Sequence, residues 1–236
     1  MAIVKDKDIK AICLDIDGTL YPRFQMNLRL IPSFFPNIKL GINFNRIRQE
    51  YRKTQESEKP TSDDRKGFLE KQAKLYLNIK NPSKEELDKV INKIDKQFYK
   101  SWEKTFLSIR GYRNMVKTLK RAKELGLKIV LLSDFPIANK VSTLKLQQIV
   151  DFAISSEETG YLKPSEKPFI YITNYLKLDP KSCIYVGDSY NKDIIGAKKI
   201  DMKTLYIANK TKGKNYPKAD YICKNWFEIE ELLFGL

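Results

Sequence analysis

The sequence predicts an α/β fold in which a parallel β-sheet, flanked by helices on both faces, forms the middle of three layers. Two observations in its 236 residues lead to this fold class. Short runs of β-branched and apolar residues alternate with amphipathic stretches, a pattern typical of parallel sheets. By contrast, residues 21–108 contain no good strand but several helical patterns. Because this interval is too long for a connector, we expect an all-helical domain inserted after the first strand.

The core of the predicted fold comprises residues 1–20 and 109–236, and the inserted domain comprises residues 21–108. We expect strands in six segments, at residues 11–14, 128–132, 152–154, 183–186, 204–207 and 219–222. We expect the helices of the core at residues 111–125, 137–150, 165–176, 191–200 and 225–234. Gly126 would end the first of these helices, and Asn225 would cap the last one.

Three helices are expected in the inserted domain, at residues 44–58, 62–77 and 83–104. In each of them, apolar residues recur at intervals of three and four. Ser62 and Ser83 precede acidic residues, so we expect their hydroxyls to cap the second and third of these helices.

The composition excludes several kinds of site. Because the chain has no histidine, it can form neither a histidine-dependent nucleophile system nor a zinc site with histidine ligands. Any general acid or base must be another titratable residue, with the carboxylates as first candidates. The formal net charge of +15 invites a nucleic-acid-binding function. Since the basic residues are mostly lysine and are spread along the chain, we interpret them as a solvated surface and do not expect a nucleic-acid partner.

The cysteines and the apolar segments indicate the cellular compartment of the protein. The three cysteines lie far apart in apolar runs, which is typical of buried thiols in a reducing compartment. No segment approaches the ~20 apolar residues of a membrane span, and the first residues do not resemble a signal peptide. We therefore expect a cytoplasmic protein without a membrane partner.

The first predicted strand leads directly into two carboxylates. Asp15 and Asp17 are two residues apart, so their side chains would point to the same side of an extended backbone. Gly18 permits a sharp turn after them. Parallel sheets bind ligands at the carboxyl ends of their strands. Taken alone, however, an acidic pair before glycine is more often an ordinary turn signal.

Later features of the sequence fall at the same edge of the predicted sheet. Ser133 follows the second strand, and Lys163 stands in a loop before a proline. Asp188 and Asp193 follow the fourth strand. Carboxylates are ligands for a hard divalent cation, whereas hydroxyl and ammonium groups donate to phosphoryl oxygens. The set therefore predicts a site for a divalent metal and a phosphoryl group.

These motifs resemble, in the same order, the four motifs of the haloacid dehalogenase-like (HAD) superfamily, in particular its phosphatases with a helical cap. The matching residues are Asp15, Asp17, Gly18 and Thr19 in the first motif, Ser133 in the second, Lys163 in the third, and Asp188 and Asp193 in the fourth. The resemblance implies a Rossmann-like core, with the inserted helices as a cap that closes over the site. Asp17 favours phosphate chemistry, because the related dehalogenases lack a carboxylate at its position.

The resemblance also implies a mechanism with Mg²⁺ as the cofactor. Asp15 would be the nucleophile that forms an aspartyl-phosphate intermediate, and Asp17 would first donate and then accept a proton. The other two residues assigned to catalysis are Ser133 and Lys163. The residues assigned to substrate binding are Gly18, Thr19, Ser133 and Lys163. The residues assigned to the metal are Asp15, Asp17 through its main-chain carbonyl, Asp188, and Asp193 through Lys163 or a metal-bound water.

Several points stay open at the level of sequence. Hydrolysis of a small phosphorylated metabolite is the leading function, with a phosphomutase as the alternative within the family and a lysine-rich nucleic-acid-binding protein as the alternative outside it. Neither the substrate nor the oligomeric state can be derived.

The roles of several single residues are also open. Asp134 replaces an asparagine that is common after the second-motif hydroxyl, and its role is open. Lys167 is an alternative to Lys163 as the lysine of the third motif. We prefer Lys163 because Lys167 begins a helix. The cap residues that could either pack or contact a ligand include Phe68, Lys71, Tyr76 and Trp102.

Overall fold

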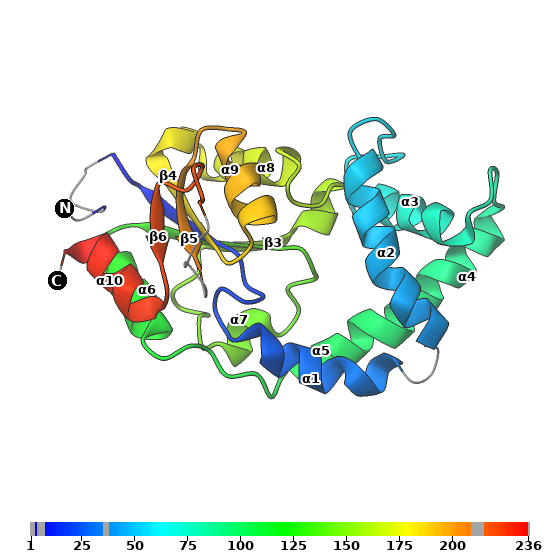
Figure 1. The fold of residues 1–236 in the computed structure, drawn as a ribbon, viewed down its shortest axis with the longest axis horizontal. Helices are drawn as coiled ribbons and strands as arrows, with labels where there is room; N and C mark the ends of the chain where they lie inside the picture. The colour runs from blue at the N-terminus through cyan, green and yellow to red at the C-terminus, as the bar shows by residue number, and fades with distance from the viewer. Residues whose placement is uncertain (1–2, 4–7, 35–37, 209–214, 236) are drawn as a thin grey trace.

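The computed structural model describes residue 3 and residues 8–34, 38–208 and 215–235 (Figure 1). Its core is a six-stranded sheet in the order β3-β2-β1-β4-β5-β6, in which every neighbouring pair is parallel. The strands are β1 (Ala11–Leu14), β2 (Lys128–Ser133), β3 (Phe152–Ser155), β4 (Cys183–Gly187), β5 (Lys203–Ile207) and β6 (Tyr221–Cys223). All six expected strands are therefore present, although the last begins at Tyr221 rather than at residue 219.

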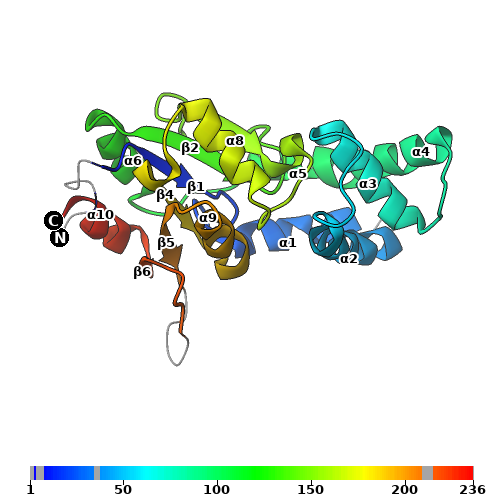
Figure 2. The ribbon, with the colours of Figure 1, turned by 90° about the horizontal axis from the view of Figure 1, so that it is seen from above.

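Helices cover both faces of the sheet, which confirms the predicted fold class. Ile12 and Leu14 of β1 point to the face on which α6 and α10 pack. Ala11 and Cys13 alternate with them and point to the opposite face, where α8 and α9 pack. In Figure 2, α8 and α10 lie on opposite sides of the strands. The helices of the core are α6 (Met115–Glu124), α7 (Lys140–Thr143), α8 (Lys167–Leu176), α9 (Ile195–Lys198) and α10 (Trp226–Phe234).

The register of the central strands sets the position of the site. β1 lies between β2 and β4, with Leu14 opposite both Leu131 and Val186. Because the three strands are parallel, their carboxyl ends meet at one edge of the sheet. Asp15 follows β1, Ser133 is the last residue of β2, and Asp188 follows β4. Side chains from distant parts of the sequence therefore converge at this edge.

Two connections of the core are less regular than expected. The predicted helix at residues 137–150 is wrong, because only the short α7 forms there. Ala138 (φ 37°) and Lys145 (φ 60°) adopt left-handed conformations that interrupt a helix. Residues 191–200 begin in a π-helix, η6 (Tyr190–Ile194), and continue as α9. The two predicted end signals are confirmed, since Gly126 follows α6 with φ 84° and the side chain of Asn225 caps α10.

The described chain from α1 to α5 is mostly helical, and in both views these helices extend from the sheet away from the two termini (Figures 1 and 2). The inserted helices are α1 (Arg23–Phe34), α2 (Ile38–Thr54), α3 (Arg65–Leu77), α4 (Lys84–Ile94), the π-helix η3 (Asp95–Tyr99) and α5 (Lys100–Phe106). Phe44, Val90, Ile94 and Phe98 pack together in a second apolar core within this segment.

The inserted segment departs from the prediction in several details. The helix predicted at residues 44–58 is α2, which begins at Ile38 and ends at Thr54. The sequence does not predict α1, which contains Pro32, a residue that ordinarily argues against a helix. The predicted helix at residues 83–104 is divided by η3 into α4 and α5. Ser83 caps α4 as predicted, but Asp64 and not Ser62 caps α3, because the Ser62 hydroxyl donates to the Asp64 carboxylate.

The remaining expectations about the chain concern its thiols and its helices. Cys13, Cys183 and Cys223 are buried free thiols, as predicted. Within the described ranges, no helix combines the length and the apolar character needed to cross a membrane.

Candidate active site

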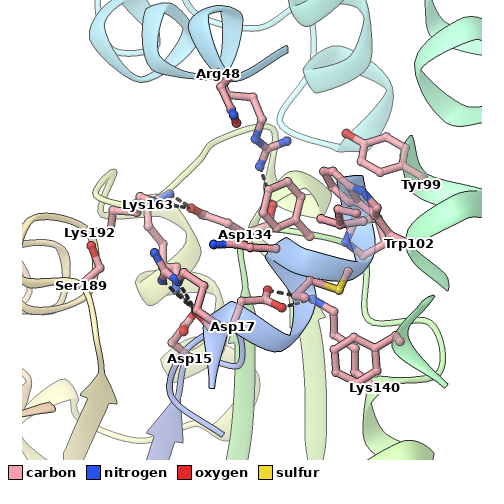
Figure 3. Close-up of a pocket in the computed structure, with 18 of the residues that line it drawn as sticks. Asp15, Asp17, Arg48, Tyr99, Trp102, Asp134, Lys140, Lys163, Ser189 and Lys192 are labelled. Carbon is pink, nitrogen blue, oxygen red and sulfur yellow. Dashed lines mark hydrogen bonds and ion pairs between the residues drawn. The ribbon is translucent and has the colours of Figure 1, made fainter. Parts of the chain in front are cut away.

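Lys163 is the centre of a charged cluster at the carboxyl edge of the sheet (Figure 3). Its ammonium lies 2.7 Å from Asp15 Oδ1 and 2.7 Å from Asp193 Oδ1. It also donates to Tyr185 Oη and to the main-chain oxygen of Leu132. Burial alone would lower the pKa of Lys163, whose side chain is only 1% exposed, but Asp15 and Asp193 raise it well above its ordinary value. The ammonium is therefore held in its charged form beside Asp15.

Three carboxylates converge next to this ammonium. Asp15, Asp188 and Asp193 each offer an oxygen, and these oxygens lie within 4.8 Å of one another. Burial and the charge of Asp15 raise the pKa of Asp188 to about 7. Burial likewise raises the pKa of Asp193 to about 6, although Lys163 opposes the shift. The cluster concentrates negative charge, which a divalent cation would stabilise.

Gly18 and Thr19 position two of these carboxylates. Gly18 has φ 107°, and a Cβ atom at this residue would collide with the carboxylate of Asp188. Thr19 Oγ1 donates to Asp15 Oδ2 over 3.0 Å and accepts from the main-chain N–H of Asp188 over 3.1 Å. The two first-motif residues therefore allow and maintain the close approach of Asp188 to Asp15.

Arg23 donates to two of the atoms that the sequence assigns to the metal. Its Nε and Nη2 lie 3.2 and 2.8 Å from the main-chain oxygen of Asp17, and Nη2 lies 2.9 Å from Asp188 Oδ1. The Arg23 side chain is 47% exposed, so it can leave these oxygens without disturbing the core. Because the same oxygens suit a hard cation, the donor set of Asp15, Asp17 and Asp188 fits Mg²⁺.

The carboxylate of Asp17 points away from the other carboxylates and is held by three donors. Ser133 Oγ lies 2.9 Å and Lys140 Nζ 2.8 Å from its Oδ2, and Tyr21 Oη lies 2.6 Å from its Oδ1. Burial alone would raise the pKa of Asp17, but Lys140 and the hydrogen bonds lower it. Asp17 thus offers only its main-chain oxygen to the cluster around Asp188.

Lys140 is a component of the site that the sequence analysis does not identify. It lies on α7, its side chain is only 6% exposed, and its ammonium donates to Ser133 Oγ over 3.0 Å as well as to Asp17. A single lysine within an amphipathic segment carries no distinctive signal in the sequence. The one available indication is that it follows Ser133 in the connection that leaves the same edge of the sheet.

The structure gives Asp134 three cationic neighbours. Arg52 Nη2 lies 2.8 Å and Lys192 Nζ 3.5 Å from its Oδ2, and Arg48 Nη2 lies 2.6 Å from its main-chain oxygen. Burial alone would raise the pKa of Asp134, but these cations hold it well below its ordinary value. Since Arg48 and Arg52 belong to α2, Asp134 joins the inserted helices to the edge of the sheet.

A cavity of about 550 Å³ lies between this edge and the inserted helices. Asp15, Asp17 and Lys163 line its polar end, whereas Gly18, Thr19 and Ser133 do not line it. Four residues of the inserted helices could, from the sequence, either pack or contact a ligand. Of these, Trp102 lines the cavity and Phe68, Lys71 and Tyr76 do not.

A comparison with protein families gives a match over most of the chain. Residues 9–201 match the family of haloacid dehalogenase-like hydrolases. The chain belongs to this family. The matched region runs from the residues before β1 into the connection after α9, so it contains all four motifs of this haloacid dehalogenase-like hydrolase.

Curated relatives of the hydrolase include two archaeal proteins of the same name. The chain is 26% identical over 204 residues to the glyceraldehyde 3-phosphate phosphatase of Methanopyrus kandleri, a match that covers 84% of each chain. It is 32% identical over 128 residues to the glyceraldehyde 3-phosphate phosphatase of Methanocaldococcus jannaschii, which covers 53% of this chain and 56% of that protein. Among solved structures, the HAD phosphatase from Thermococcus onnurineus has a similar fold, with a TM-score of 0.60, 22% identity and coverage of 96% of this chain and 99% of that one.

The two lysines considered for the third motif of this hydrolase lie in different surroundings. Lys163 is buried between Asp15 and Asp193, as described above. Lys167 is exposed on α8, and its ammonium lies 5.9 Å from the centroid of the Tyr161 ring. Only Lys163 of the two lines the cavity.

Proposed function

We propose that this hydrolase is a Mg²⁺-dependent phosphatase that cleaves a small phosphorylated metabolite. The position of the Lys163 ammonium, 2.7 Å from both Asp15 and Asp193 at the polar end of the cavity, carries the proposal. It places a fixed positive charge beside a carboxylate that faces the cavity, as nucleophilic attack on a phosphoryl group requires. The names of the archaeal relatives, which are phosphatases, support the same reaction class.

Asp15 is the proposed nucleophile. Its carboxylate oxygen forms a bond to phosphorus as the bond from phosphorus to the leaving alcohol breaks, which gives an aspartyl phosphate. Water then attacks this phosphorus, releases phosphate and restores the carboxylate. Lys163 donates to one oxygen of Asp15 and Thr19 to the other, so the orientation of the carboxylate is fixed before substrate binds.

Asp17 is the proposed proton donor to the leaving alcohol and the proton acceptor from the attacking water. In the structure its carboxylate accepts hydrogen bonds from Ser133 Oγ and Lys140 Nζ, two donors that together form a binding site for an anion. We propose that these two donors bind phosphoryl oxygens when the substrate enters, because they supply a hydroxyl and an ammonium to a new anion. Asp17 is then released from the cation that lowers its pKa, and it can carry a proton.

Bound Mg²⁺ would supply positive charge for the phosphoryl oxygens during transfer. Asp15, the main-chain oxygen of Asp17 and Asp188 would hold it. Asp193 accepts from the main-chain N–H of Ser189 and from Lys163, so its proposed part is to position that ammonium.

The inserted helices, residues 21–108, are the proposed cap domain, and residues 1–20 and 109–236 are the proposed catalytic core. Arg52 of α2 donates to the Asp134 carboxylate and to the main-chain oxygen of Lys163, so cap and core meet beside the nucleophile. Because the cavity lies between the two parts, residues of the cap select the leaving group.

Release of phosphate from p-nitrophenyl phosphate tests the proposed function. We expect turnover with Mg²⁺, its loss in EDTA and its recovery when excess Mg²⁺ is added. A sugar phosphate that is isomerised without release of free phosphate would identify a phosphomutase instead. Absence of phosphate release from this ester and from a panel of phosphorylated metabolites would contradict the proposal.

A further inference from the structure

Aromatic side chains form much of the cavity wall opposite the polar end. In Figure 3, Trp102 and Tyr99 lie across the cavity from Asp15 and Lys163. Tyr21 lines the polar end beside Asp17, and the other aromatic residues that line the cavity are Phe44, Tyr99, Trp102, Phe106 and Phe135. The polar end can bind a phosphoryl group, so this wall is available to the rest of the substrate.

Trp102 and Phe135 are the rings of this wall that remain partly exposed. Their centroids are 4.7 Å apart at an interplanar angle of 86°, an edge-to-face arrangement. Phe44 packs against Trp102 in the same manner, with centroids 5.5 Å apart. These contacts fix the orientation of Trp102, and a fixed aromatic surface is the feature on which flat rings stack in binding sites.

Two buried donors on the cavity wall have no hydrogen-bond partner. Trp102 Nε1 and Arg48 Nε are both buried without an acceptor, and both residues line the cavity. A buried donor without a partner costs free energy, and such groups are rare in folded proteins. Neither nitrogen is accessible from the empty cavity, so its side chain must turn toward a bound ligand to reach an acceptor there. A ring that carries acceptor atoms on its edge would then satisfy the donor.

The size of the cavity agrees with such a ligand. At about 550 Å³, it is within the range of roughly 300–1,000 Å³ that is typical of sites for drug-sized molecules. A triose phosphate has only three carbons beyond its phosphate and no ring to pack on the aromatic wall. A nucleoside monophosphate has both a sugar and a flat heteroaromatic base beyond its phosphate.

We infer that the substrate is a phosphomonoester whose leaving group carries a planar heteroaromatic ring, the chemistry of the nucleoside monophosphates. The phosphoryl group lies at Asp15 and Lys163, and the ring packs against Trp102 and Phe135. The inference rests on the proposed phosphatase function and specifies its substrate class. That class differs from the triose phosphate in the names of the archaeal relatives.

Ribose 5-phosphate and the four common nucleoside 5′-monophosphates form a suitable substrate series, because the nucleotides add a base to the same sugar and phosphate. The kcat/KM of at least one nucleotide should exceed the values for ribose 5-phosphate and glyceraldehyde 3-phosphate by tenfold or more, since base stacking on an aromatic side chain is worth about that factor. A smaller ratio for all four nucleotides would overturn the inference.

A pair of variants tests the position of the ring. Trp102→Leu should lower the ratio of kcat/KM between nucleotide and ribose 5-phosphate at least fivefold. Because both substrates are measured on the same preparation, this ratio does not depend on the fraction of the variant that folds. Phe24→Leu replaces an aromatic residue of α1 that is 62% exposed and outside the cavity, and it should keep the wild-type ratio. An unchanged ratio in Trp102→Leu would overturn the inference.

The same assays distinguish an error in the substrate class from an error in the proposed phosphatase function. If p-nitrophenyl phosphate is hydrolysed but no nucleotide is preferred over ribose 5-phosphate, the substrate class is wrong and the phosphatase function stands. If none of these esters releases phosphate, the proposed function itself is wrong.

Discussion

Arg23 Nη2 lies 2.9 Å from Asp188 Oδ1, and the same nitrogen lies 2.8 Å from the main-chain oxygen of Asp17. Both oxygens belong to the proposed magnesium site. The guanidinium and a metal ion would therefore compete for the same ligands, and the exposed Arg23 side chain would have to leave for Mg²⁺ to bind at the proposed site.

Arg23→Ala is expected to bind Mg²⁺ about fivefold more tightly than the wild type. The variant removes a competing cation whose exposed ion pair is worth about 1 kcal/mol, which corresponds to that factor. Titration calorimetry without substrate measures the affinity. Arg29→Ala is the matched control, because Arg29 lies on the same helix and donates to the main-chain oxygen of Gln25 outside the site. Weaker binding of Mg²⁺ to Arg23→Ala would contradict the competition.

Lys140→Met is expected to weaken inhibition by inorganic phosphate about tenfold or more and to raise the KM for phosphate esters. Methionine retains an apolar stem at this buried position but removes the ammonium that is proposed to bind phosphoryl oxygens. Steady-state kinetics with phosphate as the inhibitor provide the measurement. Lys145→Met, an exposed lysine in the same connection, should behave as the wild type. Undiminished inhibition in Lys140→Met would rule out its assigned role.

Glu157→Gln is expected to lower the free energy of unfolding by about 3 kcal/mol. Glu157 Oε1 lies 2.6 Å from Arg48 Nη1 and 3.0 Å from Tyr99 Oη, and the side chains of Glu157 and Arg48 are 0% and 2% exposed. Loss of the carboxylate charge leaves the buried guanidinium without its ion-pair partner, and Asp134 compensates its charge only in part. Urea denaturation measures the change.

The neighbouring residue supplies the control for that measurement. Glu158 is 44% exposed and lies 3.7 Å from Arg65, so Glu158→Gln should change stability by no more than about 0.5 kcal/mol. Equal stability of the two variants would show that the buried pair does not hold α2 against the core.

The position of the motif residues could be derived from the sequence because each of them adjoins a strand. Asp15, Ser133 and Asp188 stand at the ends of three apolar segments, and parallel pairing alone brings such ends together. The six strands were predictable for the same reason, since each is a short apolar run between turns. No information about distant contacts is needed for either prediction.

Other parts of the site depend on contacts that no local pattern contains. Lys140 reaches Asp17 only because the chain after β2 turns at Ala138 instead of forming the predicted helix. Asp134 is paired with Arg52, which lies 82 positions earlier in the sequence. Arg23 is an exposed residue at the start of α1, a helix that the sequence does not predict.

Phosphate release by Asp15→Asn in saturating Mg²⁺ tests the proposed nucleophilic role of Asp15. We expect kcat to fall by about 10³-fold or more, because the amide cannot form the aspartyl phosphate. Far-UV circular dichroism and thermal unfolding should show that the variant remains folded. Turnover by the folded variant within tenfold of the wild type would contradict the claim.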